Sequence, residues 1–256
     1  MKHTRVSLFY VAAAIMAVYA RCAQILYLTE EKSGFFQSES HTLAVALTVF
    51  IVLAALCSAA VAFFDLRQPK REENPSALLS IAGIPLALSF LYEVLFMEYV
   101  TDSVIFVTLT NIFAVLSAVS FCIMPLKKVF HDYKKIFSLL YIFPLLFFLF
   151  KLICVFTVYS TVSVIASNVF YLAFLSSALL FFLYVAKLEN GIPLKSALLL
   201  PVGIICSMFA LCCFVPQVIA FGMSAENLVH DNPHGLALCG ATAIYSIVYT
   251  FSLYKK

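Results

Sequence analysis

The chain has 256 residues, of which 64% are hydrophobic and only 11% charged, and its formal net charge is +3. Soluble domains carry roughly 25% charged residues, so this composition excludes an ordinary water-soluble protein. Apolar stretches long enough to cross a bilayer recur along the whole length. They leave no segment long enough for a soluble catalytic domain, so any chemistry must lie within the membrane or at its edge.

These stretches predict an all-α, polytopic integral membrane bundle of about eight transmembrane helices in a single domain, residues 1–256. Short connections near 98–102 and 159–162 make the third and fourth helices, and the fifth and sixth, antiparallel neighbours. In chain order, the predicted spans are 6–28, 42–64, 77–97, 103–125, 137–158, 163–186, 197–221 and 236–254.

Lysine and arginine concentrate on one side of these spans, as expected for cytoplasmic loops. Of the 16 such residues, Lys32 falls in a predicted outer loop, and Arg21 and Lys151 fall within spans. The bias predicts both termini on the cytoplasmic side of the cell membrane. Short loops and the absence of an Asn-x-Ser/Thr acceptor, where x is not Pro, favour a bacterial membrane. The residues assigned to the inside are Lys2, Arg5, Arg67, Lys70, Arg71, Lys127, Lys128, Lys134, Lys135, Lys187, Lys195, Lys255 and Lys256.

The N-terminus allows a second interpretation. Basic residues precede an apolar run, and Val18-Tyr19-Ala20 fits a signal-peptidase site, so cleavage of residues 1–20 is one alternative. Against it, the apolar run resumes at Cys22 and reaches Leu28, which gives a span long enough to cross the membrane. Cleavage would leave seven helices and move no other loop to the opposite side.

The chain also divides into two halves of four helices, 1–128 and 129–256, that resemble a tandem repeat. Arg21 in the first helix matches Lys151 in the fifth, each the sole cation of its span. Pro85 in the third helix matches Pro201 in the seventh. The offsets vary, so the alignment needs gaps, and a duplication is one interpretation of it.

Polar residues inside spans are the strongest functional signal, because a charge near the bilayer centre costs about 2.5–3.5 kcal/mol. At 1.5 Å per residue, all of them lie in the outer half, roughly 6–12 Å below the outer end of their span. The inner halves of the spans hold only Ser, Thr, Tyr and Cys as polar groups. The candidate ligand-binding residues are Arg21, Gln24, Glu93, Asn111, Lys151, Asn168 and Gln217.

Helical spacing places Arg21 and Gln24 on one face of the first helix. Two cations and one carboxylate at similar depth favour an anionic or zwitterionic ligand, for instance a carboxylate held by Arg21 with Glu93 as counter-ion. The alternative is structural. Long basic side chains extend to the head groups, and Asn and Gln bond neighbouring helices.

The chain shows no catalytic motif and no paired acidic residues within a span, so we expect no enzymatic activity. We expect no cofactor and no nucleic-acid partner. His230 and His234 lie four residues apart, but Pro233 prevents a regular helix through them, so we expect no metal site. The basic segment 126–135 predicts contact with anionic lipids on the inner leaflet; docking of a cytoplasmic partner is the alternative.

Two functions remain open. The first, narrowly favoured by the tandem halves and the prolines within spans, is a small-solute transporter with an outward-facing polar vestibule. It predicts that Arg21→Ala or Glu93→Ala abolishes flux while the protein stays folded. The second is a non-transporting sensor or a subunit of a larger membrane complex. It predicts a membrane-protein partner and solute flux that does not respond to those substitutions.

Overall fold

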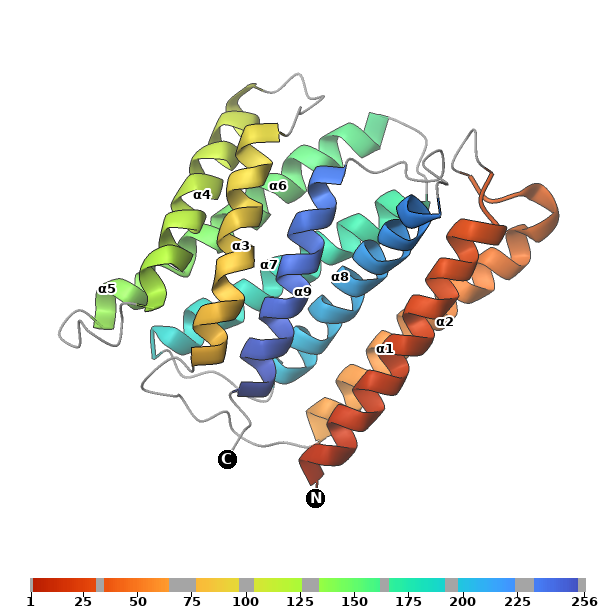
Figure 1. Ribbon diagram of the computed structural model, residues 1–256, viewed down its shortest axis with the longest axis horizontal. Coiled ribbons are helices and arrows are strands. Elements are labelled where there is room, and N and C mark those ends of the chain that lie inside the picture. Colours follow the sequence, from red (N-terminus) through yellow and green to blue (C-terminus); the bar gives the residue numbers. More distant parts are fainter. Residues whose placement is uncertain are drawn as a thin grey trace.

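A computed structural model describes residues 2–30, 35–64, 77–96, 104–125, 134–161, 166–191, 198–223 and 233–252. These residues are almost entirely helical, with no strand among them beyond an isolated bridge between Thr29 and Phe36. The elements are α1 (Lys2–Tyr27), η1 (Ser38–Ser40), α2 (His41–Phe64), α3 (Ala77–Phe96), α4 (Val104–Ile123), α5 (Lys134–Leu139), α6 (Ile142–Thr161), α7 (Ala166–Glu189), α8 (Leu199–Gly222) and α9 (Pro233–Ser252) (Figure 1).

Within the described residues, eight helical segments are long and apolar enough to cross a membrane, which confirms the predicted number. They identify the chain as a multi-pass membrane protein. Each overlaps one predicted span. The seventh segment, for example, is Leu199–Gly222.

The predicted span 137–158 is not one continuous helix, because the helix is interrupted between α5, which ends at Leu139, and α6, which begins at Ile142. Pro144 follows the break and has no N–H to donate to the carbonyl of Leu140. The backbone N–H of Phe143 donates to that carbonyl instead, at 3.3 Å. The break therefore follows from the proline.

Six helices form a closed ring, in which α3 packs on α4, α4 on α6, α6 on α7, α7 on α8, α8 on α9, and α9 on α3. The predicted neighbours, α3 with α4 and α6 with α7, are thus confirmed. Aromatic side chains from five of these helices contact one another and fill the space that the six helices enclose. The buried rings are Phe90, Phe121, Phe147, Phe148, Phe174, Phe181, Phe182 and Tyr245.

The remaining pair, α1 and α2, packs outside this ring, where both helices contact α8. Small buried residues of α1, such as Ala13 and Ala17, let the helices approach closely. The hydroxyl groups of Tyr10 on α1 and Ser207 on α8 lie 2.8 Å apart in a buried hydrogen bond. In Figure 1, α1 and α2 form one edge of the molecule.

The ends of the bundle differ in what they hold. At the upper end of Figure 1, α1 ends at Tyr27 and α2 begins at His41; we call this the His41 end, and the charge bias predicts that it faces outward. Helix α1 begins and α9 ends at the opposite end. The basic segment 126–133 and His230 lie outside the described residues, as do the cations at 67–71 and at the C-terminus.

Candidate functional site

The candidate site begins with Arg21, which is buried near the His41 end of α1 with only 2% of its surface exposed. Its guanidinium donates to Oε1 of Gln24 at 3.1 Å and to Oγ of Ser167 on α7 at 3.2 Å. The same group lies 4.2 Å from the centroid of the Phe170 ring, within the range of a cation–π interaction. A cation from α1 is thus held against the first turn of α7.

Gln24 extends this cluster to α2. Its Nε2 donates to the carbonyl oxygen of Ala44 at 2.7 Å and to Oγ1 of Thr48 at 2.8 Å. The predicted face shared by Arg21 and Gln24 is therefore real, and their side chains bond each other. We call Arg21, Gln24, Thr48, Ser167 and Phe170 the arginine cluster.

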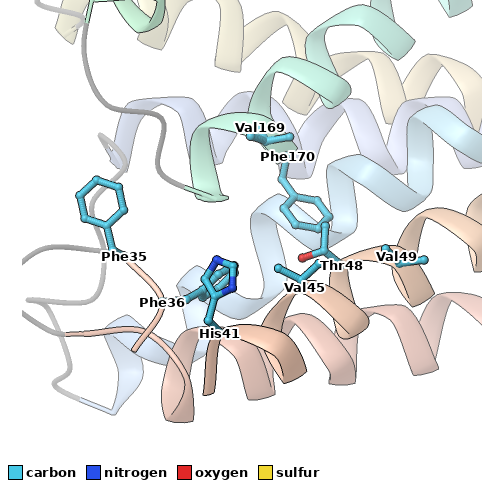
Figure 2. Close-up of a pocket in the computed structure, with 8 residues that line it drawn as sticks. All are labelled: Phe35, Phe36, His41, Val45, Thr48, Val49, Val169 and Phe170. Atoms are coloured by element: carbon cyan, nitrogen blue, oxygen red, sulfur yellow. The ribbon is translucent and has the colours of Figure 1, made fainter. Parts of the chain in front are cut away.

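A groove of about 350 Å³ lies between α2 and α7, directly in front of the arginine cluster. Thr48 and Phe170 belong to both, so the groove shares a wall with the buried cation. Figure 2 shows the Thr48 hydroxyl and the Phe170 ring side by side, with the His41 imidazole nearer the end of the bundle. The complete lining is Phe35, Phe36, His41, Val45, Thr48, Val49, Val169 and Phe170.

The segment between α1 and α2 folds back to close one end of this groove. The backbone N–H of Glu30 donates to the carbonyl of Phe35 at 2.8 Å, and that of Gln37 donates to the carbonyl of Leu28 at 2.9 Å. This hairpin-like pairing brings Phe36 beside His41 at the start of α2, with the Phe35 ring farther out (Figure 2).

Glu93 and Lys151 form a second, separate polar centre. Nζ of Lys151 on α6 lies 2.6 Å from Oε2 of Glu93 on α3, and both side chains have 0% exposure. Helices α3 and α6 are not neighbours in the ring, so this ion pair crosses its inside. The other carboxylate oxygen, Oε1 of Glu93, is buried and has no hydrogen-bond partner among the described residues.

The structure therefore divides the predicted residues between two centres. Arg21 and Gln24 lie behind the groove, whereas Lys151, rather than Arg21, carries the counter-charge of Glu93. Asn168 and Gln217 are both buried, on α7 and α8. Asn111 is half-buried on α4, and its Oδ1 is buried without a hydrogen-bond partner in the described part of the chain. None of these three amides lines the groove.

The groove itself was not predicted, although α2 carries a signal for it. His41 and Thr48 lie seven residues apart, so they share a face of an otherwise apolar helix with Val45. The aromatic wall has no such signal, because its members come from separate segments that meet only in the fold.

The opposite end of the bundle holds a polar cluster that was likewise not predicted from the sequence. Helix α7 continues beyond its predicted end at 186, which buries Glu189. The hydroxyl of Tyr249 donates to Oε1 of Glu189 at 3.1 Å, and that of Tyr245 donates to the hydroxyl of Tyr141 at 3.4 Å. Tyr141 lies in the break between α5 and α6, so its bond to Tyr245 holds the break against α9, whereas the bond of Tyr249 to Glu189 joins α9 to α7.

No protein family, curated protein or solved structure matches the chain. Its class, a multi-pass membrane protein, is therefore defined by its helices.

Proposed function

We propose that this membrane protein binds a small anionic or zwitterionic ligand in the groove between α2 and α7, as a sensor or as the ligand-binding subunit of a complex. The observation that carries the proposal is the shared wall, where Phe170 lines the groove and stacks on the buried guanidinium of Arg21. A positive charge held in a low-dielectric environment favours a ligand with a negative group.

Two further features support binding in this groove. Its volume of about 350 Å³ falls within the usual range for small-molecule pockets, about 300–1,000 Å³. Helices α2 and α7 both begin at this end, and helix N-termini favour negative charge.

The space enclosed by the six helices is filled with side chains, which favours ligand binding over passage of a solute through the bundle. Aromatic side chains such as Phe148 and Phe182 stack there, with their centroids 5.3 Å apart. The groove lies outside the ring of helices, on the side where α1 and α2 pack. A ligand in the groove therefore contacts α2 and α7 without entering the bundle.

A blocked groove tests this proposal. Val45→Phe places a ring in the groove, whereas Leu43→Phe, also exposed on α2 but outside the groove, is the matched control. Octanoate, benzoate and glycine betaine are titrated against purified protein while the melting temperature is followed, because a ligand at about 100 times its Kd stabilises by ~2.7 kcal/mol. We expect saturable stabilisation of the wild type and the control. Equal stabilisation of Val45→Phe would contradict the proposal.

Transport of a small solute is the second candidate, and the ion pair between Glu93 and Lys151 favours it. Membrane-embedded charges commonly mark ion or proton pathways, and this pair lies inside the ring with one carboxylate oxygen unbonded in the described structure. Proteoliposome counterflow with a ligand from the stabilisation assay separates the two. A carrier exchanges the ligand and loses exchange in Glu93→Gln, whereas a sensor or subunit binds it without exchange.

A further inference from the structure

We infer that the ligand is a single-chain amphiphile that enters the groove sideways from the membrane, with its anionic or zwitterionic head group toward His41 and its tail between α2 and α7. This inference rests on the proposed function and names the ligand class of the same groove. Three properties of the groove carry it: the direction in which it opens, its depth in the leaflet and its size.

The groove opens toward lipid. Val45, Val49 and Val169 line it and are 42%, 51% and 49% exposed, respectively, on helices that are otherwise apolar. In a transmembrane segment, exposed apolar side chains face acyl chains rather than water. A hydrated solute would lose water along this side of the groove and gain only contacts with valine side chains, which is unfavourable for its polar groups. An acyl chain has no such polar groups to desolvate.

The depth of the groove matches one leaflet. Helix α2 has 24 residues and is therefore about 36 Å long, roughly 6 Å more than the hydrocarbon core. With the excess divided equally, His41 lies about 3 Å above the hydrocarbon boundary, among the head groups, and Val45 and Val49 lie roughly 3 and 9 Å below that boundary. The polar end and the apolar wall of the groove thus follow the polarity of the leaflet.

At the head-group end of the groove, His41 offers ring nitrogens that can donate to or accept from a charged head group. Thr48 lies seven residues deeper along α2, and its hydroxyl donates to the carbonyl of Ala44 at 3.0 Å. The guanidinium of Arg21 lies behind the Phe170 ring, 4.2 Å from its centroid, and places a positive charge beside this deeper wall. The volume of about 350 Å³ is at the small end of the ligand-pocket range, which favours one chain over the two of a phospholipid.

The sequence contains no tryptophan, so a single introduced indole reports its own surroundings. Phe36→Trp places it on the groove wall, and Phe50→Trp, an equivalent exchange at an exposed position of α2 outside the groove, is the control. Each variant is reconstituted in nanodiscs of unbrominated phosphatidylcholine and titrated with dibromostearic acid, whose bromine atoms quench indole fluorescence on contact.

We expect quenching of Phe36→Trp to saturate, while Phe50→Trp is quenched in proportion to the acid dissolved in the bilayer. Adding Val45→Phe to the reporter should remove the saturable component, and adding Leu43→Phe should leave it. Dibromostearyl alcohol, with the same chain and no charge, should bind on the order of fivefold more weakly, the scale of charge effects near helix N-termini.

Proportional quenching of both reporters by dibromostearic acid overturns the inference. The proposed function is then tested separately with tribromobenzoate, a water-soluble carboxylate. Saturable quenching of Phe36→Trp by tribromobenzoate alone would mean that the groove binds a solute from water, so the proposed function would stand without the amphiphile. Proportional quenching by both compounds would overturn both.

Discussion

The two cations within the membrane, Arg21 and Lys151, are stabilised by different chemistry. Lys151 lies against a carboxylate at 2.6 Å, in a pair with no exposed surface. The contacts of Arg21 include an amide oxygen, a hydroxyl and the face of an aromatic ring. A planar guanidinium suits these three contacts, because it combines several donors with a surface that stacks.

Loss of either member of the ion pair should destabilise the protein far more than loss of both. Glu93→Leu or Lys151→Met leaves one uncompensated buried charge, which costs about 3–5 kcal/mol in folded proteins. The double variant removes both charges and should return to within about 1 kcal/mol of the wild type. Unfolding in mixed dodecyl maltoside and SDS micelles measures these differences. Additive losses would mean that the two side chains do not interact.

Gln24 should contribute much less. Its amide bonds α1 to α2 through Ala44 and Thr48, and interhelical hydrogen bonds in membranes are worth about 0.6 kcal/mol on average and ~1.7 at most. Gln24→Leu should therefore lower the free energy of unfolding by roughly that amount in the same assay. Thr108→Val is the control, because Thr108 is exposed and its hydroxyl bonds within its own helix to the carbonyl of Val104. A loss of more than about 3 kcal/mol would assign Gln24 a larger role.

At this scale, the sequence predicted which residues matter better than it predicted their partners. The spacing of Arg21 and Gln24 within one helix is fixed by helical geometry, so their contact was predictable. The partner of Glu93 was not predictable, because Lys151 lies 58 residues away. The depth of a residue along its span does not indicate which other helices its side chain faces. Only the packing order of the ring brings α3 and α6 face to face.

Among the elements, α8 joins the outer pair to the helix ring, since it packs on α1 and α2 as well as on α7 and α9. Contact with several neighbours requires small residues at its surface, because there is no room for a side chain where two backbones approach closely. Gly203 lies at such a point. A Cβ there would overlap Oγ1 of Thr250 on α9 and lie 3.2 Å from its Cβ and Cγ2.

Gly203→Ala should therefore destabilise the protein by about 1–3 kcal/mol, the usual cost of overpacking. Rotation of Thr250 about χ1 can move Oγ1 away, but its Cβ stays 3.2 Å from the added carbon, so the site remains tightly packed. The matched control is Gly222→Ala on the same helix, where a Cβ meets no atom within 4 Å. Thr250→Ala combined with Gly203→Ala should recover most of the loss. An equal loss in the control would indicate a backbone effect instead of a clash.

The helices themselves followed closely from the sequence, and the exceptions have local causes. Hydropathy over about 20 residues is set by composition alone, so the eight segments were predictable. It is insensitive to one missing backbone hydrogen bond, which is why the break before Pro144 was missed. It also ended α7 too early, because Glu189 is charged, although the hydroxyl of Tyr249 compensates its burial.

In the whole molecule, the ring of six helices and the outer pair, α1 and α2, have different roles. The ring is filled by aromatic side chains and crossed by an ion pair, so it is the stable core. The pair of α1 and α2 contributes the buried cation and one wall of the groove. This arrangement could not be predicted, because apolar helices in lipid give little sequence signal about which neighbour they choose. The tandem relation of halves 1–128 and 129–256 stays a prediction.

The orientation of the whole molecule is the last prediction, and the groove depends on it. Lys and Arg are concentrated in the loops and tails opposite the His41 end, and such loops remain in the cytoplasm. The groove should therefore open in the outer leaflet. Green fluorescent protein fused after Lys256 should fluoresce in a bacterial host, and alkaline phosphatase fused after Lys32 should be active. If the activities are reversed, the groove opens in the inner leaflet, and its amphiphile must be supplied from the cytoplasmic side.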